Sequence, residues 1–305
     1  MEKIAYHIPA LLLPTIDGVV TRRDGTYIDA TFGGGGHSKE LLCRLGSGGR
    51  LFSFDQDIDA YDNRIDDKRF CFVLSNFRYL KNFMRYYGVE QIDGLVADLG
   101  VSFHHFDMAE RGFSFRYEAP LDMRMNSSSL LTAAQVVNTY DTNSLIRIFK
   151  LWGEISNAHR MADAIVKRRA QKEIYTTTEL AELLTPFCGH DKEKKELAKV
   201  FQALRIEVND EMGALKEMLT AAQELLSDGG RIAILTYHSL EDRIVKNFFR
   251  SGNIDGEIEK DFYGRKKCPL RVVNTKVITA DEQEVAENPR ARSAKLRIAE
   301  KIANE

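Results

Sequence analysis

The sequence is poor in cysteine and has no long hydrophobic run. Its four cysteines lie far apart and form no C-x-x-C pair, so neither a zinc ribbon nor a thioredoxin-like redox site is indicated. No segment approaches the roughly 18 uninterrupted apolar residues of a membrane helix. The N-terminus also lacks the charged-then-apolar pattern of a signal peptide. These absences predict a cytoplasmic protein without a membrane partner.

A strong net charge is absent as well. The formal net charge is −2 over 305 residues, which excludes a globally basic nucleic-acid binder and restricts any nucleic-acid surface to a local patch. No metal is predicted, because metal-ligand spacing is missing among the histidines His7, His104, His159 and His190. Hydrophobic residues make up 44% and charged residues 29%, as expected for one large globular domain or two smaller ones.

Short apolar runs alternate with helical patterns along much of the chain. The predicted strands are 26–31, 50–55, 69–74, 94–98 and 231–236, with later strands at 272–278 and 295–299. The predicted helices are 39–45, 79–87 and a long one over 197–226 that is closed by Gly229 and Gly230. Strands that alternate with helices predict an α/β fold with a parallel sheet covered on both faces.

The middle of the chain lacks strand candidates. Apolar residues at helical spacing indicate two helices there, through Leu145, Ile148, Phe149 and Trp152 and through Ala158, Ala162, Ile165 and Val166. The run from Thr176 to Glu179 is typical of a helix start, with Thr178 or its neighbour as the cap. The sequence therefore predicts a core formed by 1–110 and 206–305 and an inserted all-helical domain over 111–205.

A glycine-rich loop, Asp29-Ala-Thr-Phe-Gly33-Gly-Gly35-Gly36-His37, follows the first predicted strand. Glycines let a ligand approach bare backbone at the carboxyl end of a sheet. The dinucleotide pattern G-x-G-x-x-G fails, because Ser38 stands at its third glycine. The pattern D-x-x-x-G-x-G, common in methyltransferases, is present instead. S-adenosylmethionine carries cationic groups that favour nearby acids, so the loop favours this cofactor over a dinucleotide pyrophosphate. A nicotinamide-dependent reductase and a plain tight turn are the alternatives.

Two further acids end predicted strands. Asp55 closes the second strand, about twenty residues beyond the glycines, where a carboxylate can accept both hydroxyls of a ribose. Asp98 ends the fourth strand, where sheet enzymes place residues that face cofactor and substrate. Asp98 is therefore a candidate for contacting either of them, and the alternative is an acid that caps the next turn.

Longer motifs occur in order along the chain: Asp98-Leu-Gly-Val-Ser102, Ala109-Glu-Arg-Gly-Phe-Ser-Phe-Arg116, Pro120-Leu-Asp-Met-Arg-Met125, Phe201-Gln-Ala-Leu-Arg-Ile-Glu-Val-Asn-Asp-Glu211, Tyr237-His-Ser-Leu-Glu-Asp-Arg243 and Asn288-Pro-Arg-Ala-Arg-Ser-Ala-Lys-Leu-Arg297. With them, the sequence resembles the bacterial MraW/RsmH-type family over nearly its whole length. The resemblance implies a Rossmann-like, S-adenosylmethionine-dependent methyltransferase core that acts on the N4 amino group of a cytidine in small-subunit ribosomal RNA. The partner is that RNA or the assembled small subunit, and a homodimer is left open.

The resemblance also implies a cofactor site, carried over position by position. The matching positions are Gly35, Gly36 and His37 in the loop, Asp55 for the ribose, Phe77 near the adenine and Asp98 after the fourth strand. His105 stands where the family usually has a glutamine that touches the cofactor. The cofactor site expected from the loop and from the resemblance together also includes Asp29 and Gly33.

Methyl transfer to a cytosine amino group requires in-line placement and acceptors for the amino protons. Asp98 is one candidate acceptor, although the resemblance favours a cofactor role for it. His238, just past the fifth predicted strand, is a second candidate. Ser239-Leu-Glu-Asp242 has capping-box spacing, so the alternative is that this segment only starts a helix.

The candidate substrate-binding residues are Arg111, Arg116 and Arg124, which are interleaved with Phe113, Phe115 and Tyr117. Arginine among aromatic residues suits an unstacked base and its phosphates. A second basic group comprises Arg290, Arg292, Lys295 and Arg297. The helical insertion is predicted to grip RNA. A non-catalytic RNA-binding assembly factor that retains a cofactor fold is the alternative outside enzymes.

Overall fold

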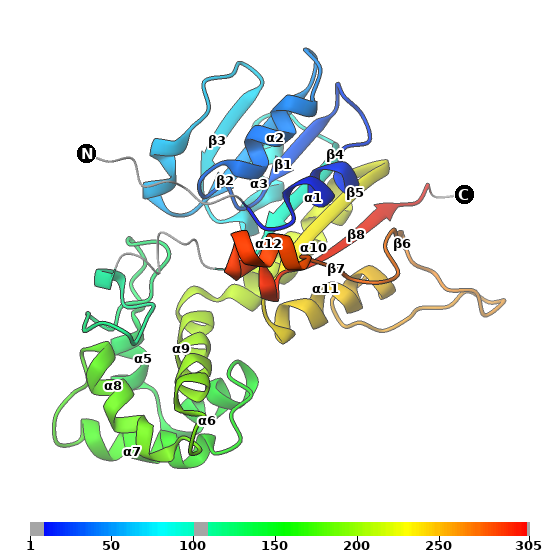
Figure 1. The fold of residues 1–305 in the computed structure, drawn as a ribbon. Helices are drawn as coiled ribbons and strands as arrows, with labels where there is room; N and C mark the ends of the chain where they lie inside the picture. The colour runs from blue at the N-terminus through cyan, green and yellow to red at the C-terminus, as the bar shows by residue number, and fades with distance from the viewer. Residues whose placement is uncertain (1–8, 101–108, 304–305) are drawn as a thin grey trace. The chain divides into compact units, whose positions relative to one another are not determined.

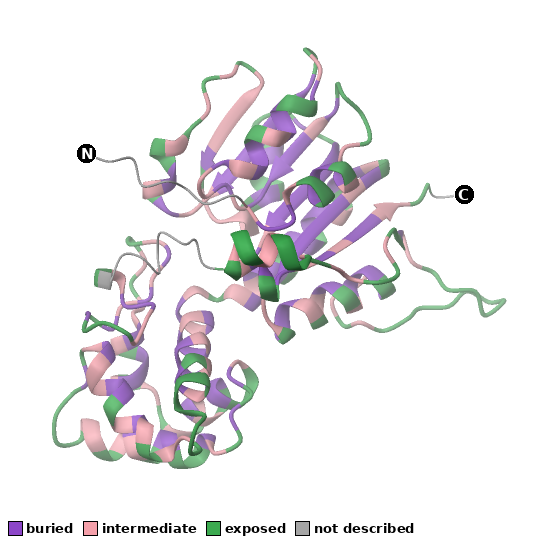
Figure 2. Cartoon of the chain, viewed as in Figure 1, coloured by how far each residue is buried: buried purple, intermediate pink, exposed green. Residues whose placement is uncertain are grey.

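The computed structural model describes residues 9–100 and 109–303 and divides the chain into two compact units (Figure 1). The first unit consists of Met1–Gly100 and Gly213–Glu305, and the second of Val101–Met212. The range predicted for the insertion, 111–205, lies inside the second unit. Each unit has its own apolar core, and Figure 2 shows buried residues concentrated in the strands of the first unit.

An open, mainly parallel sheet forms the centre of the first unit. Its strands are β1 (Thr26–Asp29), β2 (Arg50–Asp55), β3 (Phe70–Leu74), β4 (Ile92–Asp98), β5 (Leu226–Thr236), β6 (Leu270–Val272), β7 (Ile278–Thr279) and β8 (Lys295–Lys301). The strand order is β3-β2-β1-β4-β5-β8-β6, and β7 pairs with β8. Strands β1 to β5 run parallel, whereas β8 is antiparallel to β5. The chain reverses its direction of winding between β1 and β4, which is where such sheets bind ligands.

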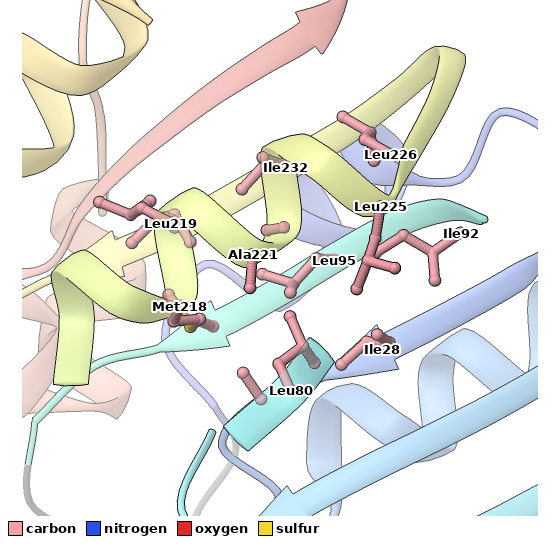
Figure 3. Packing of buried hydrophobic residues seen from close by; sticks show 14 of the residues in the cluster. Ile28, Leu80, Ile92, Leu95, Met218, Leu219, Ala221, Leu225, Leu226 and Ile232 are labelled. Carbon is pink, nitrogen blue, oxygen red and sulfur yellow. The ribbon is translucent and has the colours of Figure 1, made fainter. Parts of the chain in front are cut away.

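Helices cover both faces of this sheet. They are α1 (Leu12–Val19), α2 (Gly36–Arg44), α3 (Leu80–Tyr86), α10 (Glu211–Leu225), α11 (Ser239–Ser251) and α12 (Glu282–Glu287), with short 3-10 turns η1 (Ile58–Asn63), η2 (Phe77–Tyr79) and η5 (Pro289–Ser293). Successive strand residues point to opposite faces, so Leu95 packs with α3 and α10 while Val96 packs with α1 and α2. Figure 3 shows Ala221 of α10 next to Leu95 of β4. The predicted α/β fold is confirmed.

Two of the predictions for residues 197–278 are wrong. The expected long helix over 197–226 is two helices, α9 (Glu193–Asn209) and α10, because Asp210 adopts a left-handed conformation with φ +45°. Gly229 closes no helix but lies in the first part of β5, where the register against β4 shifts. The expected strand over 272–278 is two separate short strands, β6 and β7, each paired with β8.

Among its described residues, the second unit contains helices joined by loops and has no strand, apart from one bridge between Pro120 and Thr176. Its elements are η3 (Ala109–Arg111), α5 (Ala133–Thr139), α6 (Thr142–Leu151), α7 (Ala158–Arg169), α8 (Thr177–Leu184), η4 (Thr185–Phe187) and α9. Helix α8 begins with a capping box in which Thr176 is the cap, not Thr178 or its neighbour. Within the described residues, no helix has the length and apolar character required to cross a membrane.

Candidate active site

The glycine-rich loop connects β1 to α2 at the carboxyl edge of the sheet. Gly33 and Gly35 adopt left-handed conformations with φ +49° and +75°, which favour glycine. A Cβ added to Gly35 would lie 3.0 Å from the Phe32 ring, and one added to Gly36 would lie 2.3 Å from Pro9. A Cβ added to Gly33 would meet no described atom within 4 Å. The loop is therefore tightly packed on one side and bare at Gly33.

Asp29 lies beneath this loop and is fully buried. Its Oδ2 accepts a hydrogen bond from Ser38 Oγ at 2.7 Å, and its Oδ1 accepts one from the backbone N–H of Thr31 at 3.1 Å. Ser38 Oγ also lies 2.7 Å from Ser53 Oγ, which links α2 to β2. Burial raises the pKa of Asp29 to about 6, although the hydrogen bonds from Ser38 and Thr31 oppose the rise. Full burial keeps a ligand from reaching this carboxylate, so the geometry favours a role for Asp29 in shaping the loop.

Asp55 and Phe77 lie at the same edge of the sheet as the loop. Asp55 Oδ2 accepts a hydrogen bond from the N–H of Gly33 at 2.8 Å, and its Oδ1 accepts one from the N–H of Asp57 at 2.9 Å. Burial is the largest cause that raises the pKa of Asp55 to about 6. Phe77, in the turn after β3, is half-buried against the core. Asp55, the acid that ends β2, is thus hydrogen-bonded directly to the backbone of Gly33.

Asp98 at the end of β4 is hydrogen-bonded to Tyr237, which follows β5. Tyr237 Oη donates to Asp98 Oδ1 at 2.7 Å, and the N–H of Asp98 donates to Thr31 Oγ1 at 2.6 Å. Burial raises the pKa of Asp98 to about 7, the Tyr237 hydrogen bond opposes this, and the negative charge of Asp29 adds to it. Asp98 keeps a side chain that is 22% exposed, so it can be reached by a ligand.

His37 lies in the first turn of α2, with its Nδ1 3.9 Å from Asp98 Oδ2. Burial lowers the pKa of His37 to about 4, so the ring is neutral at pH 7 and forms no salt bridge with Asp98. Its Nε2 is buried without a hydrogen-bond partner among the described residues. An unpartnered, buried ring nitrogen at the start of the helix that follows the glycine-rich loop fits a site for a polar ligand.

His238 is itself the cap of α11, one residue before the predicted capping position at Ser239. Its ring Nδ1 accepts from the N–H of Glu241 at 3.4 Å, and Glu241 Oε2 accepts from the N–H of His238 at 3.3 Å. The ring's Nε2 lies 3.1 Å from Glu241 Oε1. The structure thus supports the helix-start interpretation of this segment, with Glu241 in place of Asp242 as its acid.

Arg111 and Arg124 of the second unit are engaged by the protein itself. Arg111 Nη2 donates to the carbonyl oxygens of Arg124 and Met125, each at 2.9 Å. Arg124 forms a bidentate pair with Asp122, at 2.8 and 2.7 Å, and also donates to two carbonyl oxygens of the following loop. Both guanidinium groups therefore hold the loop around 122–129 in shape.

Arg116 differs from the other two arginines, because it is exposed, as is its neighbour Tyr117. The other two interleaved aromatic residues face the core: Phe113 is buried, and the Phe115 ring packs on Phe201 at 5.3 Å between centroids. The predicted arginine–aromatic surface is thus reduced to Arg116 and Tyr117. His104 and His105 lie outside the described residues.

The second basic group, near the C-terminus, is also partly committed to the fold. Arg297 Nε donates to Asp242 Oδ1 at 2.7 Å, and Lys295 Nζ lies 3.6 Å from Asp242 Oδ2. Arg292 is exposed. The main role of Lys295 and Arg297 is therefore to connect β8 to α11 through their contacts with Asp242.

Known proteins resemble this chain over nearly its whole length. A model of the MraW methylase family matches residues 4–302. Ribosomal RNA small subunit methyltransferase H of Phocaeicola vulgatus is 60% identical over 299 residues, which cover 98% of each chain. The protein of the same name from Bacteroides thetaiotaomicron is 58% identical over 300 residues, or 98% of this chain and 99% of that one. The chain belongs to the MraW methylase family.

Among solved structures, an rRNA methylase from Streptococcus thermophilus aligns over 95% of this chain and 92% of that one, with 11% identity and a TM-score of 0.42. That likeness is too distant to add to the assignment. Membership of the MraW methylase family confirms S-adenosylmethionine as the predicted cofactor. The site fits this molecule, because acids with raised pKa values surround a bare backbone and would be stabilised by a cationic ligand.

Sequence reasoning missed three residues that support the candidate site. Tyr237 begins one of the family motifs and lies just past β5, and its position at the carboxyl edge of the sheet is the signal that places it next to Asp98. Ser38 stands where the dinucleotide pattern has its third glycine, and its hydroxyl donates a hydrogen bond to Asp29. Ser53 in β2 gave no sequence signal, because a buried serine inside a strand resembles any small residue.

Proposed function

We propose that this methylase transfers a methyl group from S-adenosylmethionine to the N4 amino group of a cytidine in small-subunit ribosomal RNA. The observation that carries the proposal is the full-length similarity to proteins named ribosomal RNA small subunit methyltransferase H. The choice of cytidine N4 rests on the family resemblance of the motifs quoted above. The site geometry is compatible with an amino acceptor, since a carboxylate of raised pKa stands at the end of β4.

The cofactor is assigned to the loop and to the acids at the strand ends. The proposed binding residues are Gly33, Gly35, Gly36 and His37 in the loop, Asp55 for the ribose, Phe77 for the adenine, Asp98 and His105. Asp29 acts from below by holding Ser38 and the turn at Thr31. When bound, S-adenosylmethionine supplies an electrophilic methyl group on its sulfonium.

Asp98 is the residue proposed to act closest to the reaction. Its Oδ1 is occupied by Tyr237 Oη, so Oδ2 is the oxygen available for an amino proton or for a cationic group of the cofactor. Positive charge develops on the amino nitrogen during transfer, and a carboxylate with a pKa of about 7 can accept a proton near neutral pH. Tyr237 is a positioning residue, because it fixes the carboxylate and lowers its pKa.

The second unit is proposed to bind the RNA. Its exposed pair, Arg116 and Tyr117, offers a cation and a ring beside the loop that Arg111 and Arg124 hold in shape. A cytosine must leave its stack to meet the cofactor, and a ring with a guanidinium suits such an unpaired segment. Replacing both with alanine should raise the KM for RNA while leaving cofactor affinity unchanged. An unchanged KM would remove this pair from substrate binding.

The activity is tested by methyl transfer from labelled S-adenosylmethionine to assembled small subunits and to naked small-subunit RNA, both from cells that lack the enzyme. Digestion of the product to nucleosides should yield N4-methylcytidine by mass spectrometry. Asp98→Asn keeps the shape of the side chain but removes its charge, and it should lose most of the transfer. Cofactor binding without label transfer to either substrate would favour the non-catalytic assembly factor, and a different methylated nucleoside would overturn the acceptor.

A further inference from the structure

The segment between α11 and β6 forms a hairpin over 259–267, called here the aromatic–basic hairpin. The N–H of Lys267 donates to the carbonyl oxygen of Glu259 at 2.9 Å, and Lys260 and Lys266 form an antiparallel bridge. At its tip, Phe262 and Tyr263 are 99% and 82% exposed, the two most exposed aromatic side chains among the described residues. Figure 1 shows this segment extending away from the sheet.

The two rings have no part in building the turn. Asp261 Oδ1 accepts hydrogen bonds from the N–H groups of Tyr263 and Arg265, at 2.9 and 2.8 Å, and Gly264 supplies the left-handed residue with φ +78°. The rings of Phe262 and Tyr263 lie edge to face, 5.6 Å apart and inclined at 88°. Folding buries neither ring, so a binding partner is the better explanation for two aromatic residues at this position.

Charge on the aromatic–basic hairpin is opposite to that of the chain as a whole. The hairpin has four basic and two acidic residues, all exposed, in a chain whose net charge is −2. One of the two acids, Asp261, is directed into the turn by the hydrogen bonds described above. The basic residues are Lys260, Arg265, Lys266 and Lys267. A partner with negative charges and flat apolar faces fits this combination.

We propose that the aromatic–basic hairpin binds an unpaired segment of the RNA substrate, with bases stacking on the two rings and phosphates contacting the lysine and arginine side chains. This inference rests on the proposed function. A membrane surface is the weaker alternative, because two rings, one of which carries a hydroxyl, give too small an apolar tip for stable anchoring.

The hairpin serves RNA capture and takes no part in the chemical step. The hairpin leads into β6 at Leu270, which pairs with Lys301 of β8. The neighbouring residue of β8, Glu300, pairs with Arg231, near the amino end of the parallel part of β5. The hairpin therefore joins the sheet at its amino edge. The candidate active site lies at the other, carboxyl edge of the same sheet. Contacts made by the hairpin therefore add affinity for RNA without touching the reacting atoms, and their loss should change KM and leave kcat intact.

The experiment compares KM and kcat for methyl transfer to assembled small subunits from cells that lack the enzyme. The variant Phe262→Ala/Tyr263→Ala should raise KM by roughly thirtyfold or more at unchanged kcat, since it removes two rings and each stacked base contributes about 1–3 kcal/mol. Phe262→Tyr/Tyr263→Phe keeps both rings and should behave like the unaltered protein. Tyr86→Ala, which removes an 80% exposed tyrosine of α3, is the matched control and should also have no effect.

Charge is tested separately with Arg265→Gln/Lys266→Gln/Lys267→Gln. The slope of log KM against log salt should fall by about 2, because each lost phosphate contact on a single strand removes about 0.7. An unchanged KM in the alanine variant, or an equal rise in the ring-keeping variant, would overturn the proposal. So would hairpin-dependent binding to vesicles of anionic phospholipid with an unaltered KM for RNA.

Failure of the proposed function gives a different result from failure of the hairpin. If the unaltered protein methylates neither subunits nor naked RNA, the proposed function fails, and binding of a labelled single-stranded RNA oligonucleotide then tests the hairpin alone. Loss of that binding in the alanine variant would support the hairpin as an RNA contact. Equal binding by the alanine variant and the Tyr86→Ala control would reject it.

Discussion

Replacing Tyr237 with phenylalanine removes one hydroxyl and leaves the ring in place. That hydroxyl donates to Asp98 Oδ1 at 2.7 Å, and this hydrogen bond opposes the burial that raises the pKa of Asp98 to about 7. Without it, the ionised carboxylate loses a donor while its burial is unchanged. The pKa of Asp98 should therefore rise further.

The size of the shift follows from the energy of the lost bond. A hydrogen bond to a charged group contributes about 1.5–3 kcal/mol, and one pKa unit corresponds to about 1.4 kcal/mol. The pKa of Asp98 should then move up by about one to two units from its value of about 7. At pH 7 most of the carboxyl groups would be protonated and unable to accept a proton or to attract a cation.

The assay is the single-turnover rate of methyl transfer between pH 6 and 10, at saturating cofactor and RNA. Because the ionised form of Asp98 is required, the rate rises with pH, and the rising limb should move to higher pH by the same one to two units in Tyr237→Phe. The variant should be roughly tenfold slower at pH 7 and should approach the normal rate at high pH. If the rising limb of the pH–rate profile lies at the same pH in both proteins, or if the rate falls by the same factor at every pH, this account of Tyr237 is refuted.

Three further results are expected. The free energy of unfolding, measured with denaturant, should fall as the pH rises from about 4 to 7. The aspartates that end β1, β2 and β4 have folded pKa values of about 6 to 7, above the unfolded value, and therefore take up protons on folding. Bound cofactor should offset part of this loss of stability. His238→Ala should lower the free energy of unfolding by about 1 kcal/mol, because the helix cap is lost. His238→Asn keeps a capping side chain and should have the stability and turnover of the unaltered protein. A loss of turnover in the asparagine variant would assign the ring a chemical role. Gly33→Ala should weaken cofactor binding in calorimetry, whereas Gly88→Ala, also left-handed and facing open space, should cost similar stability and leave binding unaltered.

Local patterns predicted the layers of the fold well, because burial repeats with the period of the backbone. The predicted strand 50–55 is β2 without any change of bounds, and the strand ends that converge at one edge were found from their acids. The break at Asp210 was invisible, since the apolar spacing continues from α9 into α10 and no glycine marks the left-handed residue. Hydrophobic spacing reports which residues are buried and contains no information on where a continuous pattern changes direction.

Residues of the candidate site could be predicted from the sequence only where their position along a single element determines their place in the site. Glycines and strand-end acids were identified because their position along one element already fixes their place at the sheet edge. The partner of Asp98 is 139 residues away, and no spacing rule connects Tyr237 to it. Charge alone was also misleading, because Arg111 and Arg124 satisfy neighbouring carbonyl and carboxylate groups, whereas Arg116 is exposed. Sequence gives the sign of a charge but not the direction in which its side chain points.

Ser38 gives the sharpest test of how the loop is held, since its hydroxyl joins two buried partners, Asp29 and Ser53. Ser38→Ala should cost about 2–4 kcal/mol in the free energy of unfolding at pH 8, because both partners lose a hydrogen bond inside the core. The hydrogen bond from Ser38 lowers the pKa of Asp29, so the variant should also raise that pKa above about 6. At pH 5 the carboxyl is protonated in both proteins, and the cost should shrink. Ser47→Ala, at an exposed serine, is the control. A loss below about 0.5 kcal/mol, or one equal at both pH values, would show that the loop is held by its glycines and not by this buried acid.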